Sequence, residues 1–189
     1  MAIGRQDACN SNDMRAGHGR RLWVSGRSRS ATRGWFRVGS LIFPCALGRT
    51  GLSAAKREGD GATPSGTWRP VLVLYRADRG QRPRTGLPVR ALKPDDGWCD
   101  AVRDRNYNRW VRHPYPASAE RLWRQDELYD VIVVLDHNRR PRIQGAGSAI
   151  FMHLARPGYR PTEGCVALER RDLLLVLGMA GRDTRVTIA

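Results

Sequence analysis

The chain has 189 residues, enough for one domain with its own hydrophobic core. Its 33 Lys and Arg against 18 Asp and Glu give a formal net charge of +15, which favours a polyanionic partner such as nucleic acid, anionic lipid or an acidic cell-wall polymer. An arginine-rich solvated surface explains the same charge equally well. The arginines are scattered and no known nucleic-acid module is present, so no nucleic-acid partner is expected. The lack of internal repeats disfavours solenoids and propellers.

The N-terminal residues 1–20 are polar and contain several glycines, which predicts a disordered extension ahead of one domain at 21–189. No apolar segment at this end resembles a secretory signal. The longest early apolar run, 41–47, is interrupted by Pro44 and is too short to span a membrane. Either the chain is not exported by the general route or its true start lies elsewhere.

Short apolar or alternating runs dominate the rest of the chain, with β-branched and aromatic residues within them and Gly, Pro and Asp between them. The predicted strands are 22–24, 35–38, 41–46, 71–75, 129–135, 149–154 and 185–188. Helical spacing of apolar residues predicts helices at 118–128 and 169–179. The Pro-, Gly- and Asp-rich region 79–115 is expected to be a long loop at a functional cleft. These elements predict a mainly β single domain with one or two short helices.

The chain contains four cysteines: Cys9, Cys45, Cys99 and Cys165. None belongs to a C-x-x-C pair or has a histidine at zinc-finger spacing, so we expect no structural metal site. Cys45 and Cys99 stand among apolar or aromatic residues and are expected to be buried free thiols. A disulfide between these two stays open as the alternative in an oxidising compartment.

A histidine, His153, closes one of the predicted strands, where alternation places Ala149, Phe151 and His153 on one face. The turn-rich loop that follows is long enough to fold back and bring Cys165 beside His153. Two other histidines of the domain are expected on the surface: His113 and His137. A lone cysteine and histidine at this spacing are more often unrelated than catalytic, so spacing alone does not decide their role.

A thiol needs such a neighbour because the thiolate is the nucleophile and only a few per cent of a free cysteine is ionised near neutrality. An adjacent imidazole can take the thiol proton. Gly164 leaves room for a carbonyl to approach the backbone amides of Gly164 and Cys165, which can hold a developing oxyanion. The neighbouring carboxylate of Glu163 is expected to raise the thiol pKa and make activation by His153 more necessary.

The glycine-rich stretch 56–68 has some features of a phosphate-binding loop, since Gly61 and Gly66 have the right separation. Thr67 and Trp68 stand where such a loop requires Lys and Ser or Thr, so we reject a nucleotide site. We expect a tight turn between strands at this position instead.

Two motifs together resemble the L,D-transpeptidase catalytic-domain family, and the similarity runs from about Leu22 to the C-terminus. The first motif is Lys56-x-Glu58-Gly59-Asp60-Gly61-x-Thr63-Pro64-x-Gly66-x-Trp68. The second motif, much later in the chain, is His153 followed by Thr162-x-Gly164-Cys165-Val166. The segments 96–100 and 107–109 are similar to one branch of this family.

The resemblance implies a β-sandwich or open barrel that attacks the stem peptides of bacterial peptidoglycan. In this family a cysteine displaces the terminal D-alanine after the diamino acid at the third position, and an amine of a neighbouring stem resolves the thioester into a 3→3 crosslink. Carried over, Cys165 is the nucleophile, His153 the base and then acid, Gly164 a backbone donor, and Thr162 the family's Ser/Thr position. The resemblance implies no cofactor or metal, and we expect a monomer in the cell envelope or periplasm.

Three departures from the family pattern bear on substrate binding. Glu163 stands where a histidine often precedes the Gly-Cys pair, and Ala167 stands where an arginine commonly follows. The interval between the histidine and the cysteine is also shorter than in many members. Because arginine binds carboxylates in a bidentate manner, we hypothesise that Arg156 or Arg160, in the loop before the cysteine, contacts a carboxylate of the stem.

Two other interpretations stay open. Water could resolve the same thioester, which would make the protein an L,D-carboxypeptidase or a crosslink hydrolase, and no residue pattern separates the two acceptors. A basic polyanion-binding protein, with Cys165 a bystander, is the alternative from another class. Its only support is the charge, and such binding should weaken steeply with salt.

Overall fold

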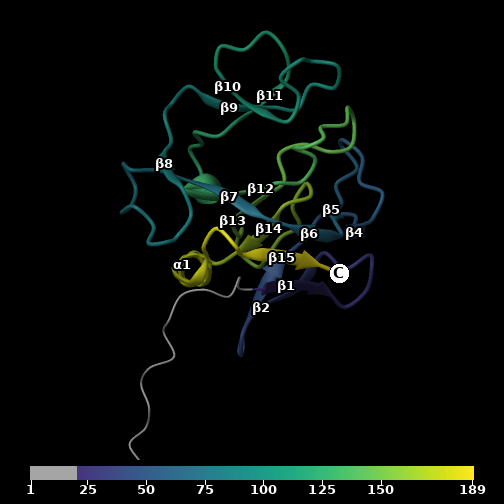
Figure 1. The fold of residues 1–189 in the computed structure, drawn as a ribbon, viewed down its shortest axis with the longest axis vertical. Coiled ribbons are helices and arrows are strands. Elements are labelled where there is room, and N and C mark those ends of the chain that lie inside the picture. The colour runs from purple at the N-terminus through teal and green to yellow at the C-terminus, as the bar shows by residue number, and fades with distance from the viewer. Residues whose placement is uncertain (1–20) are drawn as a thin grey trace, which may run out of the picture.

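Figure 1 shows the computed structural model of the protein, which describes residues 21–189. The extension expected at 1–20 lies outside the described residues. The fold is mainly β, as predicted, and is dominated by one ten-stranded sheet that curls into a half-barrel. Within 21–189, no helix is long and apolar enough to cross a membrane.

The ten strands of the large sheet have the order β6-β15-β1-β2-β3-β14-β13-β12-β7-β8. In that order they are Gly66–Trp68, Arg185–Ile188, Arg21–Gly26, Arg33–Val38, Leu41–Ala46, Val166–Leu168, Phe151–Leu154, Val131–Leu135, Pro70–Tyr75 and Val89–Ala91. The predicted strands are confirmed, with small shifts at their ends. The parallel pair β13 and β14 lies near the middle of the sheet, with β3 on one side and β12 on the other.

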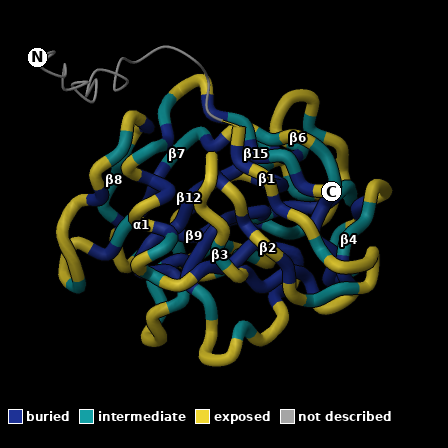
Figure 2. The backbone as a smooth tube through the Cα atoms, turned by 90° about the horizontal axis from the view of Figure 1, so that it is seen from below, coloured by how far each residue is buried: buried dark blue, intermediate teal, exposed yellow. Residues whose placement is uncertain are grey.

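The central strands are covered on both faces of the sheet, which explains why they are apolar almost throughout. In β12, Val131, Val133 and Leu135 belong to one core, whereas Ile132 and Val134 belong to a second. The central strands β12, β13 and β14 are buried throughout, whereas alternate residues of β1 and β2 and most connecting loops are exposed (Figure 2).

The first core is closed by helix α1, Arg170–Met179, which confirms the helix predicted at 169–179. Leu173, Val176 and Leu177 are its buried residues and contact this core. Asp172 in the first turn is placed to interact favourably with the positive end of the helix dipole. The helix thus leaves the opposite face of the sheet for other elements.

That opposite face packs against a three-stranded sheet of order β10-β9-β11. Its strands are Asp96–Cys99 (β9), Arg109–Arg112 (β10) and Ala119–Arg121 (β11). Trp98 of β9 meets Phe151 of β13 edge to face, with ring centroids 5.3 Å apart. The prediction of one long loop at 79–115 is therefore wrong, because this region includes the strands β8, β9 and β10.

The helix predicted at 118–128 is wrong. Its first part is the strand β11, and its end is only the 3₁₀ turn η1, Glu127–Tyr129, which Asp126 caps. Leu122 is fully buried in the second core and its amide donates to the carbonyl of Asp96. Pairing with a distant strand therefore overrides the local helical spacing.

The predicted turn within 56–68 is confirmed, since turns and loop lie between the short strands β4 (Leu52–Ser53) and β5 (Thr63–Pro64). Cys45 and Cys99 are buried free thiols, so the alternative of a disulfide between them is not found.

The prediction that His113 and His137 lie on the surface is wrong. His137 is buried, its Nε2 lies 3.0 Å from the carbonyl oxygen of Ala146, and its ring contacts Trp68 edge to face. His113 is half-buried, and its ring lies against the backbone of Gly97. Both positions had polar or turn-like neighbours in sequence, which did not reveal the packing that covers them.

Candidate active site

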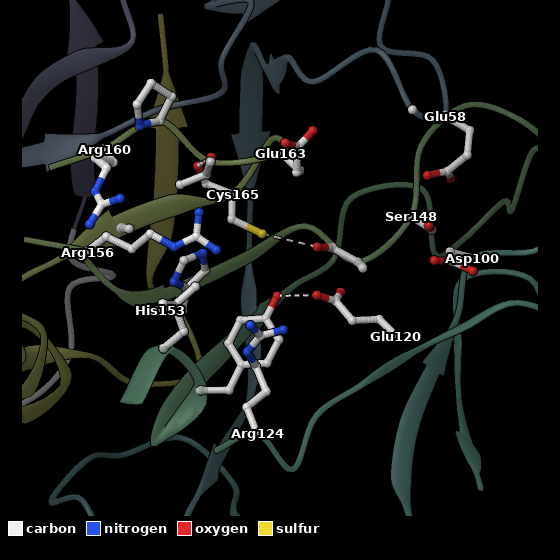
Figure 3. Close-up of a pocket in the computed structure, with 17 residues that line it drawn as sticks. Glu58, Asp100, Glu120, Arg124, Ser148, His153, Arg156, Arg160, Glu163 and Cys165 are labelled. Carbon is white, nitrogen blue, oxygen red and sulfur yellow. Dashed lines mark hydrogen bonds between the residues drawn. The ribbon is translucent and has the colours of Figure 1, made fainter. Parts of the chain in front are cut away.

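Parallel pairing of β13 with β14 brings the predicted nucleophile and base to one face of the sheet. His153 pairs with Ala167, so Cys165, two residues earlier, lies across from Phe151. The amide of Phe151 accordingly donates to Sγ of Cys165 at 3.3 Å. Because alternate residues share a face, His153 and Cys165 project to the same side and line one pocket of about 390 Å³ (Figure 3).

The sulfur of Cys165 is a protonated thiol near neutral pH. Burial raises the pKa of Cys165 to about 12, and the negative charge of Glu120 acts in the same direction. The Phe151 amide and the charge of Lys56 oppose this shift without cancelling it. The thiol donates to the carbonyl oxygen of Ala149 at 3.2 Å. Activation therefore requires a base that takes the proton when substrate is present.

The expected influence of Glu163 on the thiol is wrong. Its side chain is 79% exposed and forms an ion pair with Arg49 at 2.7 Å, with the carboxylate directed away from the sulfur (Figure 3). The carboxylate that raises the pKa of Cys165 is Glu120, on β11. The prediction assumed that Glu163 acts on Cys165 because the two residues are close in the chain, but the backbone turn at Gly164 separates their side chains.

His153 is a neutral imidazole with a fixed tautomer. Its Nδ1 lies 2.9 Å from the carbonyl oxygen of Leu154, which can only accept, so the proton resides on Nδ1 and Nε2 carries the free lone pair. Burial lowers the pKa of His153 to about 4, and the positive charges of Arg156 and Arg124 act in the same direction. No hydrogen bond joins His153 to Cys165 in the described structure, so a proton transfer between them would require the thiol to turn away from Ala149.

The loop before Cys165 is held by the hydroxyl of Thr162. This hydroxyl donates to the carbonyl of Cys165 at 2.6 Å and accepts from the amide of Gly164 at 3.2 Å. The amide of Thr162 donates to Leu47 of the neighbouring segment. Thr162 and Gly164 thus shape the turn that presents the sulfur. An oxyanion contact from the Gly164 amide requires exchange of its bond to Thr162.

We expect Gly164→Ala to lower the free energy of unfolding by roughly 2 kcal/mol or more. Gly164 has φ +131°, and a Cβ there would stand 2.7 Å from the carbonyl oxygen of Ala62. Gly158→Ala is the matched control, because Gly158 has φ +71° but no neighbour within 4 Å, and about 1 kcal/mol is expected. Urea unfolding measures both; equal losses would show that the contact with Ala62 is unimportant.

The family model of the L,D-transpeptidase catalytic domain, YkuD, matches residues 19–188, nearly the whole chain. The chain belongs to the L,D-transpeptidase family. No curated protein and no solved structure is significantly similar to it.

The first L,D-transpeptidase motif has a structural task in this protein. Lys56 is buried, and its Nζ forms an ion pair with Asp60 and donates to the carbonyl of Arg57. Gly147, with φ +91°, lies directly against the Lys56 side chain, where a Cβ would stand 2.8 Å from Cγ. The motif thus fixes the segment from which Glu58 lines the pocket.

The arginine that is common two residues after the family's cysteine is absent here, and the pocket is lined instead by arginines of the loop before Cys165. Ala167 is buried and brings no charge, while Arg156 and Arg160 line the pocket beside His153 (Figure 3). Neither arginine forms an ion pair within 21–189, so both guanidinium groups are available to a ligand. Arg124 also lines the pocket but is paired with Asp126.

Several pocket residues were missed by the sequence analysis: Glu58, Asp100, Glu120, Arg124, Ser148 and Tyr129. Glu58 and Asp100 lie inside segments that resemble the family, which was an available signal. The others come from segments whose approach to Cys165 depends on long-range packing. Within 21–189, no group of three or more His, Cys, Asp or Glu could hold a metal ion.

Proposed function

We propose that the protein is an L,D-transpeptidase that acts on peptidoglycan stem peptides through a thioester at Cys165. The observation that carries this proposal is the placement of Cys165 and a neutral His153, with Nε2 free to accept a proton, on one face of one pocket. A general base must be unprotonated and within reach of the nucleophile, and general-base assistance typically contributes 10²–10⁴-fold to the rate.

The first half-reaction forms the thioester. His153 Nε2 takes the thiol proton as Sγ of Cys165 attacks the carbonyl carbon between the diamino acid and the terminal D-alanine. The developing oxyanion is held by backbone amides of the turn at Gly164 and Cys165. The C–N bond then breaks, and the imidazolium gives its proton to the departing D-alanine amine.

The second half-reaction transfers the acyl group. The amine of a neighbouring stem attacks the thioester carbon, a C–N bond forms and the C–S bond breaks. The amine proton passes through His153 to the sulfur, which restores the free enzyme and leaves a 3→3 crosslink. The substrates of this reaction lie in the cell envelope, which we propose as the place of action, with the enzyme acting as a monomer.

Product analysis tests this function. The purified protein is incubated with a tetrapeptide stem and a second stem that carries a free side-chain amine, and the products are identified by mass spectrometry. Release of D-alanine with dimers linked 3→3 is expected. Trimmed tripeptides without dimers would instead identify a carboxypeptidase, and unchanged peptides would contradict both activities.

Arg156 and Arg160 are proposed to bind a carboxylate of the donor stem. Replacing both by alanine is expected to raise the donor KM roughly tenfold or more, because a hydrogen bond to a charged group contributes about 1.5–3 kcal/mol. Arg171→Ala combined with Arg182→Ala, which removes two exposed arginines outside the pocket, is the control for net charge. An unchanged donor KM in the double variant would refute the assignment.

A further inference from the structure

One side of the pocket is lined by three carboxylates that the thioester chemistry above does not use. They are Glu58, Asp100 and Glu120, which we call the acidic side. The three residues come from separate segments: the loop between β4 and β5, the end of β9, and β11. In Figure 3 they lie on the side of Cys165 opposite the two loop arginines. The pocket is therefore divided into a basic and an acidic half.

None of these three carboxylates forms an ion pair with a residue of 21–189. That is unexpected in a chain with 33 Lys and Arg against 18 Asp and Glu. Two of them are held by tyrosines instead: the hydroxyl of Tyr107 donates to Glu58 at 2.5 Å, and that of Tyr129 donates to Glu120 at 2.6 Å. A hydroxyl holds a carboxylate without neutralising it, so the negative charge stays available to a cation. Arg124, which is paired with Asp126, acts on Glu120 only from beyond ion-pair distance.

Two buried polar atoms on the acidic side have no hydrogen-bond partner in the described part of the chain. They are the hydroxyl oxygen of Ser148 and Oδ1 of Asp100. Ser148 is 7% exposed, lines the pocket, and lies beside Asp100 in Figure 3. Buried polar groups are nearly always paired in folded proteins, so these two atoms indicate a place where a ligand supplies the missing partner.

The acidic side lies next to the sulfur. Ser148 immediately precedes Ala149, whose carbonyl accepts the thiol proton of Cys165 at 3.2 Å. Ala149 has φ +52°, and its amide donates to Oδ1 of Asn108 at 3.2 Å, so the surroundings hold a backbone conformation that alanine rarely adopts. The charge of Glu120 also reaches the thiol, as its effect on the pKa of Cys165 shows. A ligand on this side is therefore adjacent to the acyl carbon of a Cys165 thioester.

We propose that the acidic side binds the ammonium group of the acyl acceptor, with the Ser148 hydroxyl as a further hydrogen-bond partner. This inference rests on the proposed function and names its acceptor site. A primary ammonium has one positive charge and three donors, which matches carboxylates that lack cationic partners and a hydroxyl that lacks any partner. The loop arginines would hold the donor's carboxylate. The donor would then bind on one side of the Cys165 sulfur and the acceptor on the other.

The bound ammonium must become a neutral amine before it attacks. We assign the removal of its extra proton to Glu120, a pocket carboxylate that is held by the Tyr129 hydroxyl and by no cation of 21–189 within ion-pair distance. The neutral nitrogen then attacks the thioester carbon, the C–N bond forms, the C–S bond breaks, and a second amine proton passes through His153 to the sulfur. Glu120 returns its proton to solvent. Water lacks the charge that this side binds, so the site would favour transfer over hydrolysis.

The test uses Asp100→Asn combined with Glu120→Gln, which keeps side-chain shape and lets the Gln oxygen still accept from Tyr129. The donor is a tetrapeptide stem whose side-chain amine is acetylated, and the acceptor is a tripeptide stem with a free side-chain amine. We expect the acceptor KM to rise about tenfold or more and the ratio of dimer to hydrolysed product to fall by a similar factor. Thioester formation, followed by intact mass spectrometry, should not slow, because loss of the Glu120 charge removes one of the causes that raise the pKa of Cys165.

Asp183→Asn combined with Glu169→Gln, at two exposed carboxylates without ion pairs in 21–189, controls for the change in net charge and should leave the acceptor KM unchanged. Ser148→Ala is a second variant and should raise the acceptor KM about threefold, since it removes one neutral hydrogen bond. An acceptor KM equal to that of the wild type in the double variant overturns the site, and so does slowed thioester formation from the acetylated donor. Failure of the wild type to form any thioester would instead refute the proposed function, and this site with it.

Discussion

Cys165→Ala is expected to lose transpeptidation by roughly four orders of magnitude or more, because no other group can form the covalent intermediate. Intact mass spectrometry of the wild type with a tetrapeptide stem, or with a carbapenem as an acylating donor, should show one adduct, and the variant should show none. Among residues 21–189, Cys165 is the only thiol that lines the pocket. An adduct that persists in the variant would place the nucleophile elsewhere and refute the proposed mechanism.

The other buried thiols offer controls for this result. Cys45→Ala and Cys99→Ala each remove a buried sulfur outside the pocket and should retain the adduct. Cys165→Ser retains an acceptor for the amide of Phe151, which otherwise loses the sulfur 3.3 Å away. If this variant unfolds in urea like the wild type and still forms no crosslinks, the loss in Cys165→Ala comes from chemistry and not from folding.

Features of the site that depend on one strand and its alternation could be predicted from the sequence. His153 lies next to the end of a strand in which alternate residues share a face, and the loop after the strand is long enough to return the chain. The parallel pairing of β13 with β14 then makes Cys165 a neighbour of Phe151. The resemblance of two motifs pointed to the same pair, so local pattern and family agreed.

Features that depend on distant segments could not be predicted in this way. Glu120 was placed in a helix because Leu122 and its apolar neighbours have helical spacing, whereas pairing with β9 makes it part of a strand that approaches the thiol. The environment of a titratable group is set by what packs on it, and sequence neighbours such as Glu163 are a poor guide when a turn intervenes. The acidic side of the pocket was missed for the same reason.

His153→Asn is expected to slow thioester formation about 10²–10⁴-fold while the thiol stays in place, because the variant has no base to take its proton. Asparagine can keep the hydrogen bond to the carbonyl of Leu154 that Nδ1 now makes, which limits damage to the fold. His113→Asn is the control, since its ring lies outside the pocket. Single-turnover acylation followed by mass spectrometry gives the rate for each protein.

The pH dependence of the wild type separates this mechanism from one that uses a thiolate–imidazolium pair. The pKa of His153 is about 4 in the folded protein, below its ordinary value of 6.5, so the base is neutral above pH 4 and is lost by protonation as the pH falls through that value. Acylation should therefore be nearly flat from pH 7 to about pH 5 and fall below it. Alkylation by iodoacetamide without substrate should rise about tenfold per pH unit between pH 7 and 10, because the pKa of Cys165 is about 12. Fast alkylation below pH 7 would show a preformed thiolate and contradict the neutral pair.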